Sequence, residues 1–191
     1  MGIHPLINFR APVMFEEAAV RELCCLARRG YEAKFKKETF GFLFGTLSRD
    51  NHITIRRCLY YRGGEKSRTG VTFKDWSTIT RLVRRRQELA RRLRMRFLGN
   101  FHSHVEIAGE VFRGLSQEDR ESFLYDPRAI IETIVFVWGG PFKANRSISG
   151  AIVGFEPKTS YNYRIRVYAK RRNGIRQVRA KVIPSGVVVI Y

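Results

Sequence analysis

Residues 99–119 read GNFHSHVEIAGEVFRGLSQED, and two histidines in this stretch, His102 and His104, stand one residue apart at the end of a predicted strand. Side chains at positions i and i+2 of a strand point to the same side, with their Cα atoms about 6–7 Å apart. The two imidazoles can therefore converge on one metal ion such as zinc. A His-x-His pair by itself is a weak signal, which is more often structural than metal-binding.

A hydrolytic zinc site needs a third protein ligand and an open position for water. Asp119 is the candidate for this ligand, because a carboxylate is an ordinary zinc ligand. It follows Ser116 by three residues at the predicted start of a helix. Ser-x-x-Asp is also the spacing of a capping box, in which the serine caps the helix and the acid bonds back to it. The spacing alone leaves both interpretations open.

Hydrophobic periodicity predicts the secondary structure around this stretch. Helices are expected over residues 15–30 and 75–96, with a short one over SQEDRESFLYD. Strands are expected in ETFGFLFGTL from Thr39, and in HITIRRCLYY, FLGNFHSH, IETIVFVWG and SISGAIVGFE. This order indicates an α/β (α+β) protein with one central mixed β-sheet flanked by helices.

Three finer expectations concern helix 75–96, segment 62–70 and the C-terminal region. The helix is expected to bury an apolar stripe and to expose its arginines as a solvated face. The Gly-rich, charged segment RGGEKSRTG (62–70) is expected to be a loop with little reason to pack. Residues 160–183 predict a hairpin turning at Asn173-Gly174, with basic residues alternating with Ile165, Val167 and Ala169. The predicted apolar stripe of the helix consists of Trp76, Ile79, Val83, Ala90 and Leu93.

Three segments together resemble the JAMM/MPN family of zinc metalloproteases. They are ETFGFLFG (38–45), GNFHSH (99–104) and SQED (116–119), which stand in the order of the family's ExxGxLxG, GxxHSHP and Ser-x-x-Asp motifs. The resemblance covers roughly residues 15–155. It implies a cytidine-deaminase-like JAMM/MPN fold over residues 1–155. Residues 156–191 would then form a basic C-terminal β-hairpin extension packed on the same domain, serving either as a recruiting element or as an extra sheet edge.

The resemblance also implies a function and roles for five residues. His102, His104 and Asp119 would bind Zn²⁺, Glu38 would be the general base, and Ser116 would hydrogen-bond the developing oxyanion. The chain would then be a zinc-dependent isopeptidase or peptidase that cleaves a ubiquitin-like or other protein tail.

The chain departs from the family pattern at two places. Val105 stands where the family usually has proline, and the loop 105–115 is about four residues longer than usual. The family's strict spacing would place the aspartate at Leu115, which cannot bind a metal. The loop also carries Glu106 and Glu110, which could compete as ligands or hold a substrate, or could simply be solvated acids.

The formal net charge of +19 is the main compositional feature. Such a charge attracts nucleic acid or an acidic protein partner, although a basic but passive surface is an equally good explanation. The rival functional hypothesis is therefore a JAMM-like binding module without catalytic activity. Three cysteines without a CxxC pair argue against a disulfide framework and against a thiolate zinc site. The N-terminal stretch lacks the layout of a secretory signal and no apolar run is long enough to span a bilayer, so we expect a cytoplasmic protein without a membrane partner.

Overall fold

The computed structural model describes residues 11–73, 75–107, 109, 114–141, 150–172 and 174–184 of the chain. Its helices are α1 (Glu17–Tyr31), α2 (Trp76–Leu93) and α3 (Gln117–Tyr125). Its strands are β1 (Val13–Glu16), β2 (Phe40–Leu47), β3 (Ile53–Tyr60), β4 (Glu65–Lys66), β5 (Val71–Thr72), β6 (Arg96–Val105), β7 (Ile131–Gly139), β8 (Ile152–Glu156), β9 (Tyr161–Arg171), β10 (Gly174–Val178) and β11 (Ala180–Ile183).

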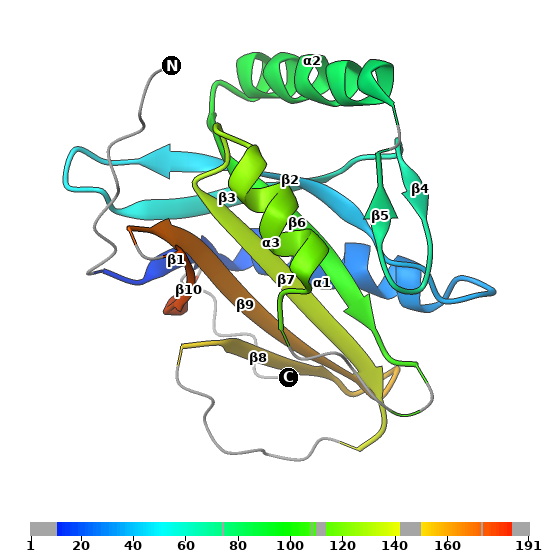
Figure 1. Cartoon of the computed structure of the whole chain (residues 1–191). Coiled ribbons are helices and arrows are strands. Elements are labelled where there is room, and N and C mark those ends of the chain that lie inside the picture. The colour runs from blue at the N-terminus through cyan, green and yellow to red at the C-terminus, as the bar shows by residue number, and fades with distance from the viewer. Residues whose placement is uncertain are drawn as a thin grey trace.

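One large mixed sheet holds all the strands except the short pair β4–β5 (Figure 1). Its order is β10-β9-β7-β6-β2-β3-β1-β11, and β8 pairs with β9 beside β10. Strand β6 lies in the middle, antiparallel to β2 and parallel to β7. Because β10 and β11 follow each other in the chain but stand at opposite ends of this order, the sheet is nearly closed. The expected α/β class with a mixed sheet and flanking helices is confirmed.

The two faces of the sheet are covered by different helices. In Figure 1, α1 lies behind the sheet and α3 in front of it. Alternation along β2 shows the same division, since Leu43 packs with residues of α1 while Phe42 and Phe44 pack against α2. Strand β6 is buried from Leu98 to Val105, as a strand covered on both faces should be.

Two glycines in the quoted segments allow strands to approach closely. A Cβ atom added to Gly99 on β6 would lie 1.8 Å from the carbonyl oxygen of Ile131 on β7. A Cβ added to Gly41 on β2 would lie 2.2 Å from the carbonyl oxygen of Leu59 and 2.5 Å from the ring of Phe101. A larger residue at Gly99 would push β6 away from β7, and one at Gly41 would push β2 away from β3 and from the Phe101 ring.

The expected apolar stripe of helix 75–96 is partly wrong. Trp76 is 80% exposed and Ile79 is 37% exposed, whereas Arg86 is buried at 3%. The buried face consists of Leu82, Arg86 and Leu89, with Val83, Ala90 and Leu93 packed beside it. Arg86 fits there because its guanidinium lies 4.2 Å from the centre of the Phe97 ring and pairs with Asp126. Hydrophobic periodicity could not predict the burial of Arg86, because its partner Asp126 lies at the end of a different helix, α3.

The expectation that segment 62–70 would not pack is also wrong. Within it, Glu65–Lys66 form strand β4, which pairs with β5 just after the segment, and the carbonyl oxygen of Ser67 accepts a hydrogen bond from the amide of Glu38 at 2.8 Å. The segment therefore helps to fix the position of Glu38, just before β2.

The C-terminal residues are strands of the main sheet. Strand β9 is internal, with β7 on one side and β8 and β10 on the other, and β11 pairs with β1. The division expected after residue 155 thus falls within β8 of a continuous sheet. The hairpin β9–β10 is confirmed, with Arg171 pairing with Gly174, while Asn173 of the expected turn lies outside the described residues. Ile165, Val167 and Ala169 lie in the core as expected.

No helix among the described residues is long and apolar enough to cross a membrane.

We predict that Asp126→Asn will lower the free energy of unfolding by about 3 kcal/mol, because it leaves the Arg86 guanidinium buried without its charged partner. The value lies at the lower end of the range for broken buried pairs, since the Asp126 side chain keeps 19% exposure. Urea unfolding measures the change. The control is Glu88→Gln, which removes the partner of exposed Arg85 and should cost no more than about 0.5 kcal/mol. Equal effects of the two variants would show that the buried pair does not secure α2.

Candidate metal centre

The two histidines converge as their spacing on a strand predicts. His102 and His104 lie on β6 with side chains about 7% exposed, and their Nε2 atoms are 3.1 Å apart. The side chains of the flanking residues, Phe101 and Val105, belong to the core that packs on α1. The histidines therefore point to the opposite face, toward α3.

Asp119, on the first turn of α3, completes the cluster. Its Oδ1 lies 3.3 Å from Nε2 of His102, and its Oδ2 lies 3.6 Å from Nε2 of His104. The ligand atoms of the three residues all lie within 4.8 Å of one another. Two imidazole nitrogens and a carboxylate at such distances could hold a metal ion.

Asp119 also takes part in the capping box, so the two interpretations left open by the sequence are compatible. The Asp119 amide donates to Oγ of Ser116 at 3.0 Å, and the Ser116 amide donates to Oδ2 of Asp119 at 2.8 Å. The preceding Leu115 is buried against Ile134 and Phe136. The capping box and the packing of Leu115 together fix the start of α3. The Asp119 carboxylate therefore points at the histidines although the loop before the helix is long.

Glu132 on β7 is a residue of the site that the sequence analysis missed. It is buried, and its Oε1 lies 3.0 Å from Nδ1 of His102. When His102 donates from Nδ1 to this carboxylate, its Nε2 lone pair is directed at the cluster. The signal was a lone acid within the apolar run IETIVFVWG, because a buried carboxylate in a strand needs a partner.

Glu38 lies just before β2 and close to His104. Its Oε1 is 4.0 Å from Nε2 of His104, and the residue is 5% exposed. Its neighbour Thr39 donates to Oγ of Ser103 from both its amide, at 2.8 Å, and its hydroxyl, at 3.0 Å. Ser103, the residue between the histidines, thus ties the Glu38 segment to β6.

Burial and mutual contacts shift the pKa values in this metal-free arrangement. Burial raises the pKa of Glu38 to about 8, with nearby His102 lowering it and Asp119 raising it further. Burial lowers the pKa of His102, but hydrogen bonds to Asp119 and Glu132 overcome this and hold it well above its usual value. Burial raises the pKa of Asp119, but its bonds to both histidines bring it well below its usual range.

The remaining candidates have other contacts or lie outside the described residues. Glu106 accepts a hydrogen bond from the Tyr31 hydroxyl at 2.7 Å and lies 3.7 Å from Nζ of Lys36, so it belongs to the link between α1 and the sheet. Glu110 lies outside the described residues. For Ser116, the contacts present are those of the helix cap, and its role toward an oxyanion stays a prediction.

Comparison with known proteins adds a similar fold but no activity. No protein-family model matches the chain, and no curated protein matches its sequence. The solution structure of protein DSY2949 from Desulfitobacterium hafniense, a structural genomics target, is similar with a TM-score of 0.54 and 16% identity. The similarity covers 91% of this chain and 94% of that chain. At this identity it shows the fold alone.

We predict that Glu132→Gln will weaken metal binding by about 10–100-fold without abolishing it, because the ligands remain while His102 loses its charged orienting partner. Metal titration against a competing chelator measures the affinity. Glu118→Gln is the matched control, since Glu118 is an exposed acid beside Asp119 and makes no contact with the histidines. The prediction fails if both variants bind metal as the unchanged chain does.

Metal affinity is also predicted to rise with pH. His102 must lose its extra proton to offer Nε2, and its raised pKa keeps that proton in place at lower pH. Raising the pH toward this pKa removes the proton, so affinity should rise by up to about tenfold per pH unit for each proton displaced. Calorimetry in buffers of different ionisation enthalpy counts the protons released. An affinity that stays constant between about pH 6 and 8 would contradict a charged His102.

Proposed function

We propose that this protein is a zinc-dependent peptidase or isopeptidase of the JAMM type. The observation that supports it best is the convergence of His102, His104 and Asp119 beside a second buried carboxylate, that of Glu38. Three of these residues could serve as ligands while the fourth stands free to exchange a proton. The resemblance of the three sequence segments to the JAMM/MPN motifs supports the same proposal.

The spacing of the candidate ligands suits zinc. Tetrahedral zinc with ligand bonds of about 2.0–2.1 Å places ligand atoms about 3.3–3.4 Å from one another. Here the two Nε2 atoms are 3.1 Å apart, Oδ1 of Asp119 lies 3.3 Å from Nε2 of His102 and Oδ2 of Asp119 lies 3.6 Å from Nε2 of His104, so the distances have the size that zinc needs although they involve both carboxylate oxygens. In addition, the contact of Nδ1 of His102 with Glu132 directs Nε2 of His102 toward the cluster, where it could bind a metal ion once it has lost its proton. Three protein ligands would leave the fourth position open, as in catalytic zinc sites.

Zinc bound at these residues would make water a nucleophile at neutral pH and polarise a carbonyl. Glu38 is placed to take the proton of the attacking water on Oε1 and to return it to the leaving amine. Burial raises the pKa of Glu38, and the charge of a bound zinc ion would lower it again toward neutral pH, where a general base works best.

Ser116 can serve the same reaction without giving up its structural role. A hydroxyl has one donor hydrogen and two acceptor lone pairs. Oγ of Ser116 accepts the Asp119 amide in the capping box, which leaves its hydrogen for a developing oxyanion. Such a donor typically contributes about 10²–10³ in rate.

For the substrate we propose a ubiquitin-like or other protein tail in the cytoplasm. A second candidate function is that of a binding module for nucleic acid or an acidic protein, favoured by the net charge and by the exposed arginines of α2. These exposed residues are Arg81, Arg84, Arg85, Arg91 and Arg92. Binding through them would weaken steeply with salt and would not depend on Glu38.

The proposed function predicts that Glu38→Gln will lower cleavage by about 10²–10⁴-fold while the protein stays folded and keeps its zinc. The isosteric amide removes the proton acceptor but none of the ligands. Cleavage of ubiquitin-like fusion proteins, followed by gel and mass spectrometry, measures the rate, and elemental analysis gives the zinc content.

His104→Ala and Asp119→Ala are the companion variants, and both should lose zinc as well as cleavage. Glu32→Gln is the matched control, because Glu32 is an exposed acid after α1 that should leave rate and zinc unchanged. If the unchanged chain cannot be loaded with zinc, the histidines are structural and the binding-module hypothesis takes precedence.

A further inference from the structure

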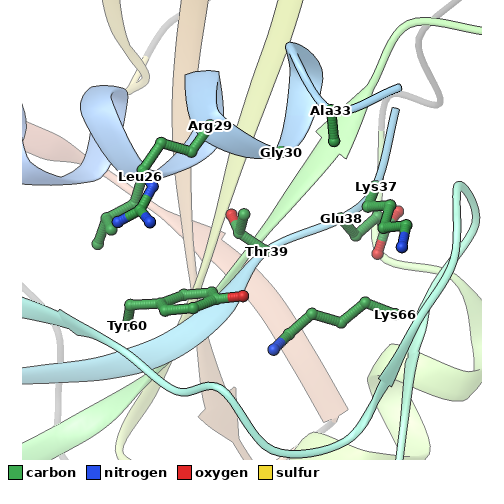
Figure 2. A pocket seen from close by; sticks show the side chains of 9 residues that line it. All are labelled: Leu26, Arg29, Gly30, Ala33, Lys37, Glu38, Thr39, Tyr60 and Lys66. Atoms are coloured by element: carbon green, nitrogen blue, oxygen red, sulfur yellow. The ribbon is translucent and has the colours of Figure 1, made fainter. Parts of the chain in front are cut away.

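A basic pocket opens beside the candidate general base. It has a volume of about 160 Å³ and lies between the end of α1, the segment leading into β2, the end of β3 and β4 (Figure 2). This is smaller than the roughly 300–1,000 Å³ of sites for drug-sized ligands, and suits a single side chain. Its lining residues are Leu26, Arg29, Gly30, Ala33, Lys37, Glu38, Thr39, Tyr60 and Lys66.

The pocket lining has an excess of positive charge. Arg29, Lys37 and Lys66 contribute three cations, and Glu38 is the one acid among the lining residues. No carboxylate of the described part of the chain forms an ion pair with any of these three cations. An anion entering the pocket would therefore meet cations that are not already paired.

Two of the cations are held in place by neutral groups. The ammonium group of Lys66 donates to the carbonyl oxygen of Tyr61 at 2.8 Å and lies 4.5 Å from the centre of the Tyr60 ring. The guanidinium of Arg29 lies 5.9 Å from the same ring centre. Both side chains thus lie on either side of one aromatic ring, as Figure 2 shows. Cations positioned before the ligand arrives lose less conformational entropy when they bind it.

The pocket and the candidate metal centre share one residue, Glu38. This residue lines the pocket, while its Oε1 lies 4.0 Å from Nε2 of His104. A substrate segment whose scissile bond lies at the histidines would consequently place a nearby side chain at the pocket.

We infer that this pocket binds the carboxylate of an aspartate or glutamate side chain close to the scissile bond, and that the substrate is an acidic protein segment. The inference rests on the proposed function and adds the substrate class to it. Lys66 holds the carboxylate by a charge-assisted hydrogen bond, and Arg29, on the other side of the Tyr60 ring, adds positive charge at the pocket. The net charge of the chain attracts the same class of substrate over a longer range.

Binding is tested first, separately from cleavage. The full chain carrying Glu38→Gln is titrated with acetyl-Ala-Glu-Ala-amide and with its glutamine counterpart, and amide NMR shifts are followed. The glutamate peptide should bind about tenfold more tightly and shift the resonances around Tyr60 and Lys66, as expected for one charge-assisted hydrogen bond. Lys66→Met keeps the length of the side chain and should remove this advantage. Lys34→Met, which removes the same charge outside the pocket, should preserve it. Equal binding of the two peptides overturns the inference, whatever the cleavage assays show.

Cleavage then decides whether the pocket serves a substrate. The zinc-loaded full chain is given a peptide library, and the cut bonds are identified by mass spectrometry. An acidic residue should be enriched at one fixed position from the cut, and Lys66→Met should lose this enrichment while Lys34→Met keeps it. Cleavage without acidic enrichment overturns the pocket assignment and leaves the proposed function standing. Absence of any cleavage overturns the proposed function, and the assignment of the pocket to a substrate falls with it.

Discussion

Strand β6 must satisfy two environments at once, and the rest of the structure follows from this constraint. It is buried from Leu98 onward and hydrogen-bonded on both edges, so each of its side chains has to find a suitable partner on one face or the other. Phe101 and Val105 fill the apolar layer beneath α1. The histidines, one residue out of phase, necessarily enter the opposite layer, where apolar packing cannot satisfy their nitrogens. That layer therefore has to supply charged and polar partners.

The partners come from three elements that are distant in sequence. Glu132 reaches His102 from β7, Asp119 reaches both histidines from α3, and Glu38 lies beside His104 at the entry to β2. Two of these acids have a second attachment, which for Asp119 is the helix cap and for Glu38 is the backbone bond to Ser67. Such a network costs stability when any member lacks a partner. A buried set of this kind is retained more readily where the charges have a use, and a metal centre with an adjacent base is the use that this geometry supports.

The sequence predicted those elements whose hydrophobic pattern or capping residues lie within the element itself. The strands β2, β3, β6 and β7, the helix α3 and the convergence of the two histidines all followed from alternation and capping. What escaped prediction depends on distant contacts. Strand β1 has only four residues and exists because β3 and β11 pair with it. Arg86 is buried because it pairs with Asp126 and lies over the ring of Phe97. Glu132 belongs to the site because β7 pairs parallel to β6 in the register that brings Glu132 close to His102.

The longer loop before α3 shows why spacing in sequence and position in space can differ. Counted along the chain, the ligand position of the JAMM/MPN pattern falls on Leu115. In the folded chain Leu115 packs on Ile134 and Phe136, the residues of β7 that pair with His102 and His104. This anchor places the next turn of chain over the histidines, and the capping box then fixes the direction of the Asp119 carboxylate. Extra residues between His104 and Leu115 lengthen the path without moving either end. The position of a ligand is thus determined by the elements on which it stands, so a loop insertion need not remove a metal centre.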